Sequence, residues 1–459
     1  MRKVFFAVFL SMVLFCCVSC GLDFMDYFST DLSSVRMLAI GMDYANSKAA
    51  SFLSGTMNDV YDMAAVFNEI MAVKNVKIET EYLVQEGYDV LLEVRCFQNA
   101  KTNSEKIEEK LKTASPAPTS VEKSGNTVRA FVESETLADS IKTSLEAEYG
   151  SHIKVSYAST RESSHYPSRQ NIMKGIQNAA ELGETDLFIV YYTGHGISLN
   201  VIPDDDFSAI LEPYRLSGGI TQDQYDTLMN VSIKNDTQVL AVISKMNIDS
   251  GIYSEICSEF STYLKSHTNL RGSLITAPYY SWEYYDLLDM ETVYRELSKL
   301  KCKVVLIVDA CYSGFANAGT FSGVSVSESF STFMQSTSYP NVVVLSASAK
   351  DETSKISIAV TEEKDTQRHS MFTIKLLSKL GWKHSAHRTT YLSVPAAIIG
   401  DDGKLAGTET KVREIEGYLS KVPLRMTATE LFDKAMGSWS GIEQTPERNT
   451  SGYEICIVP

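Results

Sequence analysis

The chain has 459 residues, a formal net charge of −15 at pH 7 and a hydrophobic fraction of 44%. This length and apolar content are typical of a globular protein with one large core or two to three modules. The acidic balance and the lack of any basic stripe argue against a nucleic acid partner, because phosphate binding depends on clustered Lys and Arg.

The first twenty residues are predicted to be an export signal. Arg2 and Lys3 precede an apolar run over residues 4–15, which is too short to span a bilayer. The following Val-Ser-Cys-Gly resembles a bacterial lipobox, which implies lipidation of Cys20. A signal peptide cut without lipidation is the alternative. We therefore expect a signal at residues 1–20, a tether at residues 21–34, and a lipoprotein exported from a bacterial cytoplasm and held on a membrane, in the periplasm or at the cell surface.

Strand-like and helix-like patterns alternate through the rest of the chain, which predicts an α/β fold with a mostly parallel central sheet flanked by helices. One helix is expected over residues 59–71 and another over residues 290–300, because each has an apolar stripe on one face. In the first, the stripe consists of Val60, Met63, Phe67, Ile70 and Met71.

Residues 76–150 are predicted to form an inserted small α+β module. Its patterns repeat a strand followed by a helix, which suggests an internal duplication. The module could recognise a partner or cover a cleft, or it could be an insertion without a function. Its strands are expected at residues 76–84, 90–96 and 127–132, and its helices at residues 104–112 and 135–149.

Two further segments each consist of an apolar run followed by a chemically reactive side chain. Residues 186–196 read DLFIVYYTGHG and residues 303–314 read KVVLIVDACYSG. The runs predict strands buried on both faces of a parallel sheet, with His195 or Cys311 beyond the strand end. In open α/β sheets the ligand crevice lies beyond the carboxyl ends of the strands, so both side chains are expected at one edge. The strands themselves are placed at residues 187–192 and 304–308.

A cysteine and a histidine at one edge favour nucleophilic catalysis. A free thiol, with a pKa of about 8.5, is mostly protonated near neutrality, and a neighbouring imidazole is the usual means of activating it. Gly194 and Gly196 are expected to let the backbone turn tightly around His195. The amides of Gly196 and Cys311 are the predicted oxyanion hole. The pattern predicts a cysteine–histidine hydrolase, whereas no G-x-S-x-G elbow supports a serine triad.

The segments YYTGHG and VDACYSG resemble the two signature segments of the caspase/metacaspase family of cysteine peptidases. The resemblance covers roughly residues 35–75, 151–200 and 271–459, in the family's order, and includes the Asn58–Asp59 pair. It implies a caspase-like domain formed by residues 35–75 and 151–459, interrupted by an insertion at residues 197–270. It also implies a Cys311–His195 dyad that hydrolyses peptide bonds through a thioester acyl-enzyme.

The chain departs from the caspase pattern in two respects. Caspases place the histidine about 50 residues before the cysteine and read Gln-Ala-Cys, whereas here the interval exceeds a hundred residues and Asp309 stands two before Cys311. The acidic residue is the metacaspase variant. The resemblance then implies that Asp59, Thr193 and Asp309 line the pocket for the residue preceding the scissile bond.

Two carboxylates in that pocket suit Arg best and Lys second, through charge-assisted hydrogen bonds. The alternative is that Asp59 caps its own helix and Asp309 only ends a strand. Residues 315–341, between the two halves of the caspase-like domain, contain no Lys or Arg. Basic specificity therefore predicts no self-cleavage there and an active form with a single chain.

Calcium is the only cofactor that the resemblance suggests, because metacaspases often require it as an activator. Asp204, Asp205 and Asp206 could supply carboxylate oxygens, or they could belong to a solvated loop. No other metal site is predicted. His369 and His384 are assigned to the surface, with a position near the cleft as the alternative, and Cys302 and Cys456 are expected to be inert buried thiols.

The expected partner is a protein or peptide substrate, and the oligomeric state stays open. Two rival functions remain. One is a catalytically idle caspase-like surface interaction lipoprotein, and the other is a legumain-like or gingipain-like peptidase with different pocket residues. A panel of peptides and the Cys311→Ala variant would separate these hypotheses.

Overall fold

In the computed structural model, the predicted signal, Cys20 and most of the predicted tether lie outside the described residues. In the part that is described, no helix is both long and apolar enough to cross a membrane. The described residues are 32–47, 50, 52–97, 100–231, 234–267, 270–277, 287–312, 339–347, 356–360, 366–437, 446–448 and 455–459.

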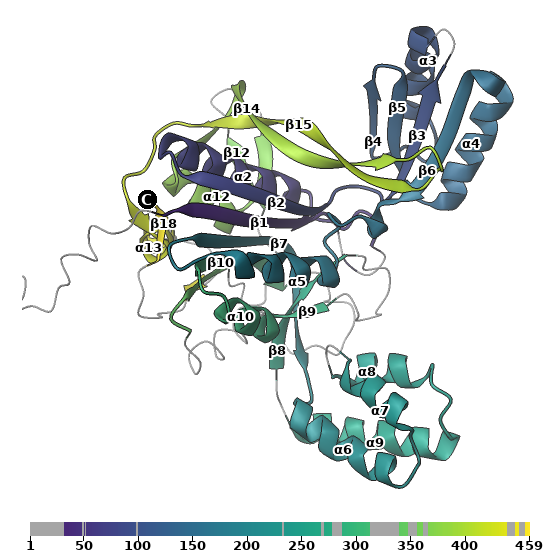
Figure 1. The fold of residues 1–459 in the computed structure, drawn as a ribbon, viewed down its shortest axis with the longest axis vertical. Coiled ribbons are helices and arrows are strands. Elements are labelled where there is room, and N and C mark those ends of the chain that lie inside the picture. The colour runs from purple at the N-terminus through teal and green to yellow at the C-terminus, as the bar shows by residue number, and fades with distance from the viewer. Residues whose placement is uncertain are drawn as a thin grey trace, which may run out of the picture.

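A central mixed sheet with the order β2-β1-β7-β10-β11-β17 organises the molecule (Figure 1). Its first five strands are parallel, and β17 is antiparallel to β11. On one side β7 also pairs antiparallel with β8, which pairs with β9. The prediction of an α/β fold with flanking helices is confirmed. The strands are β1 (Ser34–Met42), β2 (Lys77–Gln85), β7 (Leu187–Asn200), β8 (Leu270–Ile275), β9 (Leu287–Asp289), β10 (Lys303–Tyr312), β11 (Val342–Ser346) and β17 (Glu447–Arg448).

Helices cover both faces of this sheet, which explains why its strands are apolar without alternation. In β7, Leu187, Ile189 and Tyr191 pack toward one helical layer, and Phe188, Val190 and Tyr192 pack toward the other. The predicted helices at residues 59–71 and 290–300 are confirmed as α2 and α10. One layer consists of α2 (Thr56–Val73), α12 (Met371–Lys379) and α13 (Ala428–Met436), and the other of α5 (Arg169–Asn178), the short η3 (Ala179–Glu181) and α10 (Met290–Ser298).

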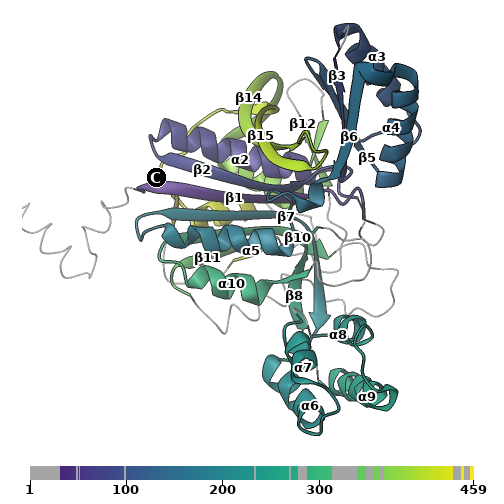
Figure 2. The ribbon, with the colours of Figure 1, turned by 45° about the vertical axis from the view of Figure 1, so that its right-hand side comes forward.

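The inserted α+β module is a βαββαβ unit with an antiparallel sheet of order β4-β5-β3-β6, the ferredoxin-like arrangement. Figure 2 shows this module set apart from the central sheet. Each half of the module consists of two strands and a helix, and the suggested internal duplication stays a prediction. The predicted boundaries are wrong by one strand at each end, because β2 belongs to the central sheet and β6 to the module. The elements are β3 (Val90–Cys96), α3 (Ala100–Lys112), β4 (Ser120–Ser124), β5 (Thr127–Val132), α4 (Glu135–Tyr149), η1 (Gly150–His152), β6 (Ile153–Ser159) and, at its exit, η2 (Thr160–Glu162).

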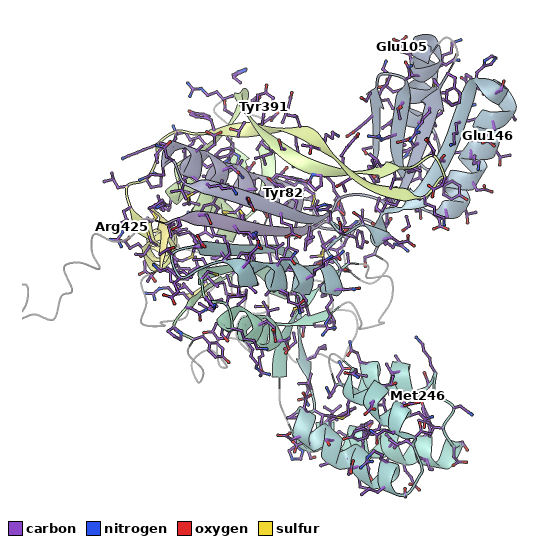
Figure 3. The ribbon with its side chains drawn as sticks, viewed as in Figure 1. Tyr82, Glu105, Glu146, Met246, Tyr391 and Arg425 are labelled. Carbon is purple, nitrogen blue, oxygen red and sulfur yellow. The ribbon has the colours of Figure 1, made fainter. Side chains whose placement is uncertain are left out.

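A long hairpin of β14 (Trp382–Ile399) and β15 (Leu405–Leu419) reaches from the central domain to this module (Figure 1). Arg95 of the module lies 2.6 Å from Asp401, and Arg129 pairs with Glu409. Figure 3 shows Glu105 and Glu146 on the outer side of the module, away from the hairpin. The remaining strands form two small antiparallel pairs, β12 (Ile356–Val360) with β13 (Thr366–Ser370) and β16 (Met426–Thr427) with β18 (Cys456–Val458).

The second insertion is a separate helical module rather than a solvated loop. It projects from the extended end of β7 and has its own apolar core, in which Phe207 stacks on Phe260 at 5.0 Å (Figure 1). Asp204, Asp205 and Asp206 form the first turn of its first helix, where the helix dipole favours acidic side chains. Its helices are α6 (Asp204–Leu216), α7 (Gln222–Met229), α8 (Asp236–Ile243) and α9 (Ser250–Ser266).

The acids expected to bind calcium have protein partners in this module. Asp204 lies 2.7 Å from the ammonium group of Lys234, and Asp206 accepts a hydrogen bond from the Tyr263 hydroxyl. Calcium binding there would have to compete with these contacts. Elsewhere, Cys302 and Cys456 are 0% and 2% exposed, which confirms that they are buried thiols.

Candidate active site

The parallel pairing of β7 and β10 brings the two predicted catalytic residues together. Cys311 stands opposite His195 in the ladder, and Asp309 stands opposite Thr193 two residues earlier. Neighbouring strands of a sheet lie about 4.8 Å apart, so residues separated by more than a hundred positions become backbone neighbours. The prediction that the strands stop at residues 192 and 308 is wrong. Both continue through the motif, so His195 and Cys311 belong to the strands rather than to turns beyond them.

The glycines beside His195 do not make a tight turn. Neither Gly194 nor Gly196 has a positive φ, and Gly196 stands between Tyr312 and Leu274 in the sheet. A Cβ atom at Gly194 would lie 2.8 Å from the Tyr44 hydroxyl and 2.9 Å from the Tyr192 hydroxyl. Gly194 is therefore needed for space. The oxyanion hole at the amides of Gly196 and Cys311 stays a prediction.

Two buried tyrosines hold the backbone of His195. The Tyr44 hydroxyl accepts the His195 amide N–H at 2.9 Å and donates to the Ile275 carbonyl at 2.6 Å. The Tyr192 hydroxyl donates to the His195 carbonyl at 2.7 Å. Burial raises the pKa of both phenols, so the hydroxyls stay protonated. These tyrosines fix where His195 stands on the strand.

Sequence reasoning missed Tyr44 as part of the site. Its backbone has a φ of 59°, which is unusual for a bulky residue and costs conformational energy. Its ring lies 4.7 Å from the His195 imidazole, between centroids. A single tyrosine in the loop after the first strand carried no motif that distinguished it. His195 itself is 1% exposed, so the imidazole is buried among the described residues.

The three predicted pocket residues also come together. The Thr193 side chain hydrogen-bonds to Asp59, and Thr193 stands opposite Asp309 in the ladder. All three are buried, and burial raises the pKa of Asp309 to about 7, with the nearby charge of Asp59 as the second cause. Burial also raises the pKa of Asp59 well above its ordinary value. Because Asp59 and Asp309 are buried near each other, at least one of the two carboxyl groups tends to stay protonated.

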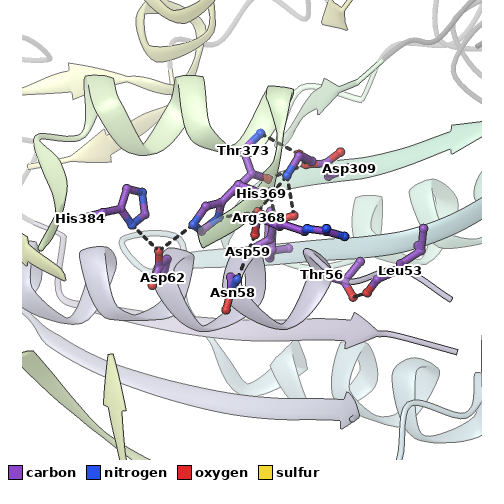
Figure 4. A network of polar contacts seen from close by, with 12 residues as sticks. Leu53, Thr56, Asn58, Asp59, Asp62, Asp309, Arg368, His369, Thr373 and His384 are labelled. Carbon is purple, nitrogen blue, oxygen red and sulfur yellow. Dashed lines mark hydrogen bonds and ion pairs between the residues drawn. The ribbon is translucent and has the colours of Figure 1, made fainter. Parts of the chain in front are cut away.

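These carboxylates already have protein partners at the junction of β13 and α12 (Figure 4). Asp59 accepts the Ser370 amide N–H at 3.1 Å and lies 2.9 Å from Nδ1 of His369. Asp309 accepts hydrogen bonds from the hydroxyls of Ser370 and Thr373. A substrate side chain that binds these acids would have to replace some of these bonds.

Asp59 and Asp309 thus anchor β13 and α12 to the sheet and to α2. The alternative that Asp59 caps its own helix is wrong, because Gly55 is the N-cap of α2 and no side chain caps that end. Instead Ser370 caps α12 through its bond from the Thr373 amide at 3.0 Å. Asn58, the other member of the predicted Asn–Asp pair, donates to the Arg368 carbonyl at 2.9 Å.

His369, which was assigned to the surface, is buried, and His384, assigned there too, is partly buried. The side chain of His369 is 0% exposed and that of His384 is 9% exposed. Burial lowers the pKa of His369 to about 4, so its imidazole is neutral near pH 7. Both imidazoles approach the carboxylate of Asp62 on α2 (Figure 4). Their isolated positions in the sequence gave no indication of this grouping.

A cavity of about 710 Å³ lies away from these residues, between the edge strand β2, the ferredoxin-like module and the β14–β15 hairpin. Asp43, Tyr61 and Arg413 are among its lining residues. Burial raises the pKa of Asp43 to about 6. Neither His195 nor the predicted pocket acids line this cavity, so the cavity is separate from the predicted catalytic site.

Comparisons with known proteins leave the family open. No family model matches the chain, and no curated protein matches it. Among solved structures, the chain is similar to protein GSU0716 from Geobacter sulfurreducens, with 13% identity, a TM-score of 0.35, and coverage of 92% of this chain and 94% of that chain. That similarity is too weak to carry an argument. What the fold itself defines is a mixed α/β protein with a mixed sheet flanked by helices.

Proposed function

We propose that this protein is a cysteine endopeptidase of the caspase/metacaspase type, in which the central sheet, with β2 included, and its flanking helices form the caspase-like fold. The observation that carries the proposal is the parallel register in which Cys311 stands opposite His195. A nucleophile and its base must be close, and adjacent strands keep these two positions close without any flexible segment between them. The grouping of Thr193, Asp59 and Asp309 one step back along the strands supports it further.

In the proposed reaction, His195 takes the thiol proton of Cys311, and the thiolate attacks the carbonyl carbon of the scissile bond. The amides of Gly196 and Cys311 stabilise the resulting oxyanion. The imidazolium then donates its proton to the leaving amine, and a thioester to Cys311 remains. Water hydrolyses the thioester with His195 again as the base, which restores the thiol and releases the carboxylic acid. Tyr44 and Tyr192 act as positioning residues by holding the backbone of His195.

We propose specificity for Arg, and then Lys, before the scissile bond. A guanidinium group can form paired hydrogen bonds with carboxylates, and Asp59 and Asp309 supply two. The hydroxyls of Ser370 and Thr373 donate hydrogen bonds to Asp309. A basic side chain can therefore bind Asp309 only if the first turn of α12 moves and these bonds break. The substrate would be a protein or peptide met by an exported, lipid-anchored enzyme. Activation by calcium is a weaker proposal, because Asp204 and Asp206 bind Lys234 and Tyr263.

A second candidate function is a catalytically idle interaction protein. The observation that favours it is burial, since His195 is 1% exposed and the pocket acids bond to the protein itself. An interaction protein needs neither a free thiolate nor an accessible base. It would tolerate replacement of Cys311 by alanine without loss of function.

A peptide panel tests the proposed function. Peptides with Arg, Lys, Asn or Asp before the scissile bond are incubated with the protein, with and without calcium. We expect cleavage after Arg and Lys, and a loss of at least about 1000-fold in kcat/KM in Cys311→Ala. Cys257→Ala, which changes a thiol in the helical module, is the matched control and should retain full activity. Cleavage that persists in Cys311→Ala, or no cleavage of any peptide, would count against the peptidase.

A further inference from the structure

Three side chains outside the proposed dyad converge on one point. They are Asp62 on α2, His369 near the end of β13 and His384 near the start of β14 (Figure 4). One ligand atom from each, Oδ2 of Asp62, Nε2 of His369 and Nδ1 of His384, lies within 4.8 Å of the others. We call these residues the Asp62–His369–His384 cluster. Carboxylate oxygen and imidazole nitrogen are both zinc ligands.

The contacts within the cluster are not ordinary hydrogen bonds. Nδ1 of His384 lies 3.2 Å from Oδ2 of Asp62, and Nε2 of His369 lies 3.5 Å from the same oxygen. None of the three atoms has a hydrogen-bond partner of acceptable geometry in the part of the chain that is described, although all three are buried. Buried polar atoms are normally satisfied, so three that face one another require an explanation.

The two nitrogen–oxygen distances agree with a tetrahedral metal ion between these atoms. Zinc bonds of about 2.0–2.1 Å in a tetrahedral arrangement hold neighbouring ligand atoms about 3.3 Å apart. The two nitrogen–oxygen distances of 3.2 and 3.5 Å lie on either side of this value. Calcium is a poor fit, because it takes six to eight oxygen ligands and two of the three donors here are imidazoles.

The surroundings of His369 also match those of a metal ligand. Its other ring nitrogen, Nδ1, lies 2.9 Å from Oδ1 of Asp59, and Asp59 is itself held by the Ser370 amide. Histidines that bind metals commonly donate their second N–H to a carboxylate, which fixes the ring and directs the free lone pair to the ion. The chain therefore supplies both the ligands and a carboxylate that orients one of them.

We propose that Asp62, His369 and His384 bind one zinc ion, with Asp59 as the positioning residue for His369 and a fourth coordination position open to water. The ion links α2, the β13–α12 junction and β14, and it adds to the Asp59–His369 contact that already joins α2 to β13. It thereby holds Ser370 and Thr373 against Asp309. This site stands on its own residues and does not depend on the proposed peptidase activity.

Metal content tests the site directly. The full chain is purified without metal-affinity steps, dialysed and analysed for zinc by mass spectrometry. We expect about one zinc per chain in the wild type, and less than about a tenth of that in His369→Ala and His384→Ala. Asp59→Asn should bind zinc about 10- to 100-fold more weakly. His267→Ala, a histidine exposed at the end of α9, is the matched control and should keep the full amount.

A second measurement decides the question if an alanine variant does not fold. Zinc is removed from the wild type with a chelator, and Co²⁺ is then added in its place. Visible absorption bands of tetrahedral Co²⁺, abolished by zinc, and a melting temperature that falls on chelation and recovers with zinc, are the expected results. A wild type that holds no zinc and gives no Co²⁺ bands overturns the proposal. So does zinc binding that is unchanged in all of the cluster variants, or binding of Ca²⁺ alone.

Discussion

The Cys311–His195 pair and the Asp62–His369–His384 cluster are assembled in different ways. The pair arises from the register of two adjacent parallel strands, so each half carries a recognisable strand and motif in the sequence. The cluster arises from packing among a helix, the end of one strand and the start of another, and the helix residue lies more than 300 positions before the two strand residues. The sequence pattern of the two strands predicts that Cys311 and His195 are neighbours, whereas no pattern predicts that side chains from a helix and two distant strands meet.

Asp59 lies between the two regions and touches both. It bonds to Thr193 on the strand of His195, and it faces Nδ1 of the buried His369. A substitution in the Cys311–His195 pair can therefore be tested for its effect on the Asp62–His369–His384 cluster, and the reverse. The following variants separate the regions or show that they work as one unit.

The largest expected effects come from changing one region and measuring both. Cys311→Ala should lower peptide cleavage by at least about 1000-fold and leave the zinc content unchanged. His384→Ala should lose the zinc. Activity assays and metal analysis on the same preparations check this. If Cys311→Ala also loses its zinc, the two regions are not separate.

Asp309→Asn distinguishes a substrate pocket from a structural anchor. If the carboxylate binds a basic side chain, the variant should lose about 10- to 100-fold in kcat/KM for peptides with Arg, because one charged hydrogen bond contributes about 1.5–3 kcal/mol. The slow background cleavage of a peptide with Asn, which makes no charged bond to Asp309, would be unaffected. An unchanged Arg-to-Asn preference would contradict the pocket and leave only the anchoring role.

The pH dependence of stability should change in the same variant. Burial raises the pKa of Asp309 to about 7, above the ordinary value of an aspartate. Its contribution to stability is therefore present at low pH and is lost as pH rises toward and through 7. Melting temperatures measured from pH 5 to pH 8 should fall less steeply in Asp309→Asn than in the wild type. Parallel curves would show that Asp309 titrates normally.

Gly194→Ala should destabilise the protein by about 1–3 kcal/mol, because the new methyl group would collide with the hydroxyls of Tyr44 and Tyr192. Denaturant unfolding measures this effect. Gly183→Ala is the matched control, since its Cβ would lie 3.6 Å from the nearest atom, at ordinary contact distance. Equal stability of the two variants would show that the tyrosine hydroxyls do not require the space at Gly194.

The last prediction is that the purified protein does not cleave itself between the two halves of the proposed caspase-like domain. If specificity is basic, the purified protein should remain a single chain through residues 315–341, which contain no Lys or Arg. Intact-mass measurement over time checks this. Spontaneous scission within that segment, abolished by Cys311→Ala, would contradict the combination of basic specificity with single-chain activity.

The central fold was predictable because its signals are local. The apolar stripe of α2, with Val60, Met63 and Phe67 all 0% exposed, follows from helical periodicity. The continuous apolar runs of β7 and β10 follow from burial on both faces. The strand ends were not predictable, because glycine and threonine in YYTGHG suggest a turn, whereas antiparallel pairing with β8 extends the strand to Asn200.

Other errors came from tertiary partners that a sequence does not display. The amphipathic β2 looks like a strand of the inserted module, yet parallel pairing with β1 assigns it to the central sheet. Burial of His369 depends on acids of α2, and Asp59 and Asp62 supply these from one helical face. Polar residues in the sequence favour the surface by default, and only the packed partners reverse that preference.

Labelling with an electrophilic peptide tests the central claim most directly. A peptide with Arg at its reactive end is added, and the modified residue is identified by mass spectrometry. We expect an adduct on Cys311 that forms much more slowly in His195→Ala. Cys96, Cys257 and Cys302 should stay unmodified, because burial raises the pKa of each of these thiols. Equal labelling of Cys311 in the wild type and His195→Ala, or no adduct on Cys311, would contradict the proposed dyad.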